Sequence, residues 1–135
     1  MRKLLASFDP DMRIAALGMV ESFEPALRVQ VVAPLLDDPV RGVRIEAART
    51  LADVADDQLS SDRRQQRERA IGEYVASLQQ DADWPTANVS LGNLRLRQGR
   101  ADEAIAAYER ALSLDPRFAG GHVNLADAYR QLGRE

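Results

Sequence analysis

The chain has 135 residues, a formal net charge of -3 and no cysteine. The lack of cysteine excludes a disulfide framework, a thiolate metal site and a c-type haem attachment motif within this sequence. The net charge is small and both signs are mixed, so the sequence does not indicate the basic surface that is typical of nucleic-acid binding. No stretch approaches the roughly 18 apolar residues of a membrane span. Aromatic residues make up only 5%, and Ala and Leu carry the apolar fraction, a composition that favours close-packed helices over sheets.

Two acidic-proline pairs predict helix starts in the first half of the chain. Asp9-Pro10 and Asp38-Pro39 each offer an Asp as N-cap and a Pro at the first helical position. Residues 1–8 are predicted to be the end of a preceding helix, and the break at Asp9-Pro10 excludes a secretory signal. Leu4, Leu5 and Phe8 are expected on one side of the first helix, and Ile14, Leu17 and Val20 are expected to face inward on the second.

A third helix starts at Pro25, and Pro34 lies inside its apolar run, so its last turn is expected to be irregular. The helix after Pro39 is predicted over residues 40–54, with its arginines exposed. Its inward positions are Val40, Val43, Ala47, Leu51 and Val54.

The first half contains a weak internal repeat. Arg44-Ile45 with Ala47 echoes Arg13-Ile14 with Ala16, a shift of 31 residues. An acidic-proline start, an Arg beside a β-branched residue and closely spaced alanines resemble a HEAT-like repeat over residues 1–55. That resemblance implies pairs of antiparallel helices whose arginines pair with acidic groups of a neighbouring turn.

Residues 56–61 are polar and predict a loop, and Ser60 or Ser61 is expected to cap a helix that reaches about Gln80. The first half of this helix, DRRQQRER, is highly charged and is expected to be solvated. The second half places an apolar face at helical spacing, formed by Ala70, Ile71, Tyr74, Val75 and Leu78.

The second half of the chain repeats with a period of 34 residues, without gaps, when residues 68–101 are laid on 102–135. The aligned pairs include Ala70 and Ala104, Ile71 and Ile105, Tyr74 and Tyr108, Leu78 and Leu112, Trp84 and Phe118, Val89 and Val123, Leu91 and Leu125, and Gly99-Arg100 and Gly133-Arg134. Two helices joined by a turn at this period resemble a tetratricopeptide repeat. Leu91-Gly92 supplies the family's Leu-Gly pair, and Gly99 and Gly133 are expected to end the first helix of each copy.

The two resemblances together predict an all-α fold, a right-handed α-solenoid of antiparallel helix pairs. HEAT-like helical repeats are assigned to residues 1–59 and tetratricopeptide-like repeats to residues 60–135, packed as one continuous solenoid. The sequence ends at Glu135 after the first helix of a repeat, so the last repeat is incomplete. An uncapped apolar end is therefore expected, so that either the sequence is a fragment of a longer chain or another copy of the chain covers this face. The apolar residues of this end are Leu125, Tyr129 and Leu132.

In tetratricopeptide repeats the first helix of each pair lines a concave groove, and the resemblance assigns that role here. The predicted groove residues are Thr86, Val89, Asn93, Leu96, Arg97, Val123, Asn124, Asp127, Arg130 and Gln131. Asn93 and Asn124 match the two asparagines with which chaperone-adaptor repeats grip a terminal carboxylate. Val89 replaces the lysine of that clamp, so a general peptide or protein groove is the preferred interpretation.

No catalytic, cofactor or metal constellation is found. His122, the only histidine, is interpreted as a surface residue. The arginines of the 61–80 helix are interpreted as a solvated face, with phosphate binding as the alternative. Trp84 is expected to pack between repeats, because Phe118 occupies the matching position, and its alternative role is a binding anchor.

The resulting prediction is a non-enzymatic protein–protein interaction or scaffold module that binds a peptide or protein partner. Two alternatives stay open. The chain is the repeat tail of a larger bacterial redox protein, because the repeat order is similar to tails of multihaem c-type cytochromes, or it is a self-assembly module. A native start at Met1 would indicate the cytoplasm, and a fragment of a secreted redox protein would indicate the periplasm.

Overall fold

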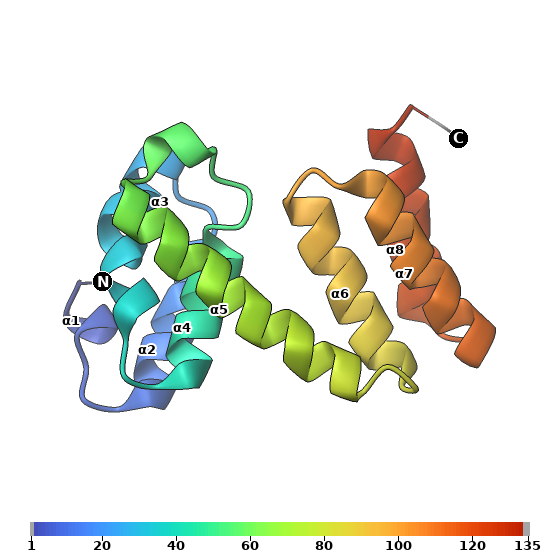
Figure 1. Cartoon of the computed structure of the whole chain (residues 1–135), viewed down its shortest axis with the longest axis horizontal. Helices are drawn as coiled ribbons and strands as arrows, with labels where there is room; N and C mark the ends of the chain where they lie inside the picture. Colours follow the sequence, from blue (N-terminus) through green and yellow to red (C-terminus); the bar gives the residue numbers. More distant parts are fainter. Residues whose placement is uncertain (1, 134–135) are drawn as a thin grey trace. The chain divides into compact units, whose positions relative to one another are not determined.

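The computed structural model describes residues 2–133, and within them every regular element is a helix. The elements are α1 (Arg2–Leu5), α2 (Pro10–Met19), α3 (Pro25–Val32), the 3-10 helix η1 (Ala33–Asp37), α4 (Arg41–Thr50), the 3-10 helix η2 (Asp56–Gln58), α5 (Ser61–Gln80), α6 (Pro85–Arg97), α7 (Ala101–Leu114) and α8 (Ala119–Gln131) (Figure 1). The all-α fold class is confirmed. The chain divides into two compact units, and the boundary between Tyr74 and Val75 falls inside α5.

The first acidic-proline pair starts a helix as predicted, whereas the second lies just before one, because the N-cap of α4 is Val40 and Pro39 stays outside the helix. Asp9 caps α2 by accepting a hydrogen bond from the Asp11 amide at 2.9 Å. At the second pair the Asp38 carboxylate accepts from the Val40 amide, also at 2.9 Å, and α4 begins one residue later. Pro34 has the predicted effect, because α3 gives way to η1 at Ala33.

Buried aliphatic residues form the core of the first unit. The largest fully buried aliphatic side chains there are Leu17, Val20, Val32, Leu36, Val43 and Leu51. The prediction that Phe8 shares one helix side with Leu4 and Leu5 was wrong, since its side chain is fully exposed whereas Leu5 is buried. The reason is that α1 ends at Leu5, so Phe8 lies in the connection to α2 and no longer follows the helical face.

Helix α5 has the predicted bounds, and Ser60 caps it by accepting a hydrogen bond from the Arg63 amide at 3.2 Å. Its charged half is not wholly solvated, however. Arg67 is only 4% exposed and donates to the carbonyl oxygens of Leu51 at 3.2 Å and Val54 at 2.7 Å. These carbonyls follow the end of α4 and need donors, which explains why a charged side chain turns inward.

The second unit follows the 34-residue period. Helix α7 packs against both α6 and α8, and α6 also contacts α8 directly, so the three lie side by side as in a helical solenoid (Figure 1). Gly99 and Gly133 adopt left-handed backbone angles, with φ of 76° and 69°. Both glycines follow helix ends, as predicted, whereas Arg134, the aligned partner of Arg100, lies outside the described residues. The continuity of the two units as one solenoid stays a prediction.

Candidate functional site

Helices α6 and α8 are held side by side by small residues packed around Tyr108. Tyr108 is fully buried on α7. A Cβ atom added to Gly92 of α6 would overlap the Tyr108 ring, so glycine at this position allows the ring to lie against the α6 backbone. The buried members of this core are Val89, Ala104, Ile105, Tyr108, Ala111 and Ala128.

A polar network joins the exposed faces of α6 and α8. The side-chain oxygen of Asn93 accepts hydrogen bonds from the Tyr108 hydroxyl at 2.8 Å and from the Asn124 amide at 2.9 Å. Burial, followed by the negative charge of Asp127, raises the pKa of Tyr108 to about 12. Tyr108 therefore stays protonated and remains a donor at neutral pH.

The two amides also keep hydrogen-bonding capacity for a ligand. Two donated bonds saturate the carbonyl oxygen of Asn93. Within residues 2–133, no hydrogen bond engages the amide nitrogen of Asn93 or the side-chain oxygen of Asn124. The pair thus presents one free NH2 group and one free carbonyl side by side.

The other predicted groove residues fall into two groups. Thr86, Val123, Arg130 and Gln131 are exposed, and Val123 is 62% exposed. Asp127 is half-buried and pairs with Arg130 at 2.7 Å. Arg97 is half-buried as well, and Leu96 packs partly buried against the core around Tyr108.

Two sequence-based assignments need correction. Val89 does not line an open groove, because it is only 9% exposed and belongs to the core around Tyr108. Leu125 and Tyr129 also pack against that core, and the Tyr129 hydroxyl donates to Glu109 at 3.3 Å. Leu132, by contrast, is 36% exposed. Helix α7 covers much of the apolar surface that was expected to be open.

Trp84 does not pack between helices as expected. Its side chain is 66% exposed, whereas Phe118, at the aligned position, packs against the core around Tyr108. Trp84 lines a hollow of about 500 Å³ together with Leu78, Asp81, Thr86, Ala87 and Ser90. The period indicated that the two aromatic residues are equivalent, but it carried no information on what surrounds each of them.

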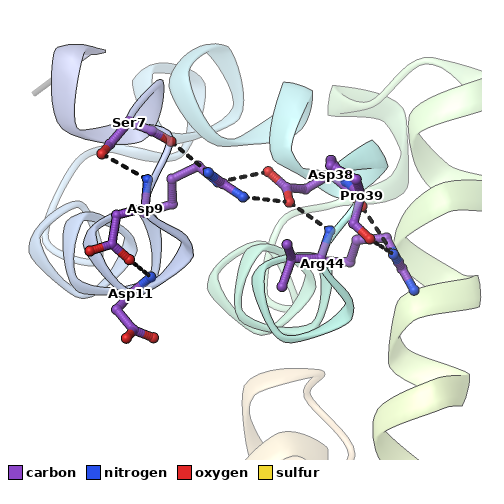
Figure 2. Close-up of polar contacts among 8 residues, drawn as sticks. Ser7, Asp9, Asp11, Asp38, Pro39 and Arg44 are labelled. Carbon is purple, nitrogen blue, oxygen red and sulfur yellow. Dashed lines mark hydrogen bonds and ion pairs between the residues drawn. The ribbon is translucent and has the colours of Figure 1, made fainter.

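A network of arginines in the first unit binds neighbouring helix ends together. Arg13 is 8% exposed, donates to the Ser7 carbonyl at 2.5 Å and pairs with the Asp38 carboxylate at 2.9 Å. Figure 2 shows Asp38 facing this network, with Arg44 bonded back to the carbonyls of Asp38 and Pro39. The terminal guanidinium nitrogens of Arg13 donate to the Ser7 carbonyl and the Asp38 carboxylate, and those of Arg44 to nearby carbonyls, which indicates a structural role.

Side chains with catalytic or metal-binding potential do not converge. The His122 imidazole is exposed and lies 2.9 Å from the Pro116 carbonyl. In the described part of the chain, no group of three or more His, Cys, Asp or Glu side chains is placed to hold a metal ion. Over the same residues, no helix combines the length and apolar character needed to cross a membrane.

Comparison with known families bears on the second unit. Residues 92–133 match the model of the TPR repeat family. This match covers the second half of α6 and all of α7 and α8, and it includes Gly92, Asn93, Tyr108 and Asn124. Neither curated proteins nor solved structures gave a match. The tetratricopeptide interpretation is thus supported over residues 92–133, and the HEAT-like interpretation stays a prediction.

The TPR repeat family is typically a non-enzymatic scaffold that mediates contacts between proteins. Sequence reasoning missed the bond between Asn93 and Tyr108, and it missed Asn88, which is 5% exposed. Asn88 stands where tetratricopeptide repeats often have Trp. An asparagine in place of this tryptophan was the available signal that nearby backbone carbonyls, those of Ala82 and Trp84, accept hydrogen bonds from a side chain.

Proposed function

We propose that the chain is a protein-interaction module and that the α6/α8 face holds an extended segment of a partner polypeptide. The observation that carries the proposal is the Asn93–Asn124 pair, bonded at 2.9 Å across the first helices of two successive hairpins. The tetratricopeptide character of residues 92–133 supports it, because that family binds proteins.

The chemistry of the pair suits a peptide backbone. The free NH2 of Asn93 is a donor for a peptide carbonyl, and the free side-chain oxygen of Asn124 is an acceptor for a peptide N–H. The bond from the buried Tyr108 hydroxyl fixes Asn93 before binding, so little side-chain freedom is lost when a partner arrives. The exposed Val123 side chain adds apolar contact beside the pair.

An internal peptide segment fits this face better than a terminal carboxylate. The carboxylate clamp of chaperone-adaptor repeats requires a lysine at the position of Val89. Val89 is uncharged and buried, so neither its chemistry nor its position compensates a carboxylate charge. Binding at this face is therefore proposed to rest on neutral hydrogen bonds.

We also propose that the tetratricopeptide repeats begin at residue 68, upstream of the matched residues, and that residues 1–59 form HEAT-like repeats. The ion pair between Arg13 and Asp38 favours that view of the first unit, since it joins equivalent turns of the two echoing segments. The module is proposed to act without catalysis. If the partner is another copy of the chain, sedimentation of the protein without peptide shows self-association.

A selection experiment tests the proposed function. A display library of random peptides is selected on the full chain, and the dissociation constants of the best peptides are measured with free and amidated carboxyl ends. Asn93→Ala combined with Asn124→Ala is expected to weaken binding about tenfold or more, since two hydrogen bonds of roughly 1 kcal/mol each are lost. Amidation is expected to change little.

The matched control replaces two exposed amides at the end of α5, Gln79→Ala with Gln80→Ala, and should leave affinity unchanged. Equal affinity of the two double variants would contradict the proposal. A strong preference for the free carboxylate would contradict the neutral mode of binding.

A further inference from the structure

The turn that joins α5 to α6 (Figure 1) carries Trp84, whose backbone is held by hydrogen bonds. The Trp84 amide donates to the Asp81 carbonyl at 2.9 Å. The Asn88 side chain donates to the carbonyls of Ala82 at 2.8 Å and Trp84 at 3.0 Å. These bonds hold the backbone of Trp84 in place while its indole stays 66% exposed. A partner that contacts the ring therefore has little chain entropy to overcome.

The surroundings of this ring are anionic. No Lys, Arg or His occurs from residue 70 to residue 94, whereas Asp81 and Asp83 flank the turn. Among the described residues neither carboxylate forms an ion pair. Both carboxylates therefore carry charges that the chain itself does not neutralise.

Helix ends contribute smaller charges to the same place. The last turn of the 20-residue helix α5 contains no basic residue, so its negative end is also uncompensated. The amino end of α6 contributes the opposite sign, but a helix end carries only about half a unit charge, against two full charges on the carboxylates. The net potential at the turn favours a cation.

We propose that the hollow lined by Leu78, Asp81, Trp84, Thr86, Ala87 and Ser90 binds an arginine side chain of a partner polypeptide. The planar guanidinium stacks on the exposed indole, an arrangement that arginine satisfies better than lysine. Asp81 accepts hydrogen bonds from the guanidinium, and Leu78 and Ala87 contact the apolar stem. The occupant is defined by charge complementarity to the unpaired carboxylates.

The inference stands apart from the Asn93–Asn124 face, because the hollow uses other residues. Trp84 is the single tryptophan of the chain, so its indole N–H resonance and its fluorescence report on this site alone. The experiment titrates the full chain with an acetylated, amidated peptide, Gly-Gly-Arg-Gly-Gly, and with two analogues that carry citrulline or lysine in place of arginine. Citrulline keeps the shape of arginine and removes its charge.

The arginine peptide is expected to shift the Trp84 resonance saturably, the lysine peptide more weakly and the citrulline peptide not at all. Asp81→Asn with Asp83→Asn is expected to weaken binding of the arginine peptide about fivefold or more. Asp57→Asn, an exposed carboxylate in η2, is the charge-change control and should have no effect. Asn93→Ala with Asn124→Ala should also leave the response intact.

Equal responses to the arginine and citrulline peptides would overturn the inference. So would equal affinity for lysine, or the same affinity in the Asp81→Asn/Asp83→Asn and Asp57→Asn variants. The circular dichroism spectrum of each variant verifies that the helices are retained, so that a lost response reports on the hollow itself.

Discussion

The two units provide hydrogen-bond donors for the carbonyl groups at their helix ends in different ways. In the first unit the buried polar side chains include three arginines, Arg13, Arg28 and Arg67, each no more than 8% exposed. In the described residues of the second unit the buried polar groups on side chains are the Asn88 amide and the Tyr108 hydroxyl, and no charged side chain is buried. Charge thus enters the interior of one unit and is kept out of the other.

The reason lies in how the helices end. In the first unit α2, α3 and α4 have ten residues or fewer. The arginines donate to carbonyls at or just beyond helix ends, as Arg28 does to Thr50, the last residue of α4, at 2.8 Å. In the second unit α6 and α8 are followed by glycines in the left-handed conformation. The Arg100 amide then bonds back to the Arg95 carbonyl at 2.8 Å. The backbone itself satisfies such an end, so no buried side chain is needed there.

The largest predicted effect breaks the charged interior of the first unit. Asp38→Ala removes the carboxylate that pairs with the buried Arg13 and also the acceptor for the Val40 amide. Leaving a buried charge unpaired costs about 3–5 kcal/mol. Hydrogen exchange measured by mass spectrometry should show lost protection in α2 and α4, with α7 little affected.

The matched control is Glu46→Ala, which removes the carboxylate of a half-buried pair with Arg49 within one helix and should cost no more than about 1 kcal/mol. Similar losses of protection in the two variants would mean that the buried arginine network does not stabilise the first unit as described.

A mid-sized effect is expected from close packing in the second unit. Gly92→Ala adds a methyl group where the Tyr108 ring lies against α6, and overpacking of this kind costs about 1–3 kcal/mol. Gly72→Ala is the control, because no atom lies within 4 Å of the added methyl and alanine favours a helix by up to about 1 kcal/mol. The unfolding temperature should fall for Gly92→Ala and rise for Gly72→Ala. Equal shifts of the two unfolding temperatures would contradict the packing described around Tyr108.

The smallest effect concerns the hydroxyl of Tyr108. Tyr108→Phe removes the bond to Asn93 and should cost about 1 kcal/mol at neutral pH. The pKa of Tyr108 is raised from 10.0 to about 12. Between these values the unfolded chain releases the proton while the folded chain retains it, so the unfolding free energy falls as pH rises.

The phenylalanine variant lacks this titration. The unfolding free energy of the wild type minus that of the variant should therefore decrease steadily from about pH 10 to about pH 12, from a positive value towards zero and below it. Chemical denaturation followed by circular dichroism measures it, and the other tyrosines cancel in the difference. A difference that stays constant across this range would show that the hydroxyl is not buried in the folded protein.

Local patterns predicted most of the helices, because caps, prolines and glycines act over a few residues. Asp9, Pro34 and Gly99 each do what the sequence indicated. Side-chain surroundings were harder to predict. Arg67 was assigned to solvent because its neighbours are charged, yet unsatisfied carbonyls after α4 hold it inside.

The candidate site was predicted only in part. The resemblance to tetratricopeptide repeats assigned Asn93 and Asn124 to one groove, and the structure brings the two amides within hydrogen-bond distance. The exposure of Val89 and Trp84 was predicted wrongly. A repeat period shows which positions along the helices are equivalent, but it does not show which atoms cover each side chain. In this chain Val89 is buried where an open groove was expected, and Trp84 is exposed where packing was expected.

The most direct test of the proposed interaction surface is a map of where a selected peptide binds. Nitrogen-15 spectra of the full chain are recorded with and without the tightest peptide from the display selection. The proposed function predicts that the largest changes fall on the side-chain amides of Asn93 and Asn124 and on the backbone around Val123. Changes confined to the outer residues of α7, such as Glu109 and Arg110, or to residues 2–59, would contradict it.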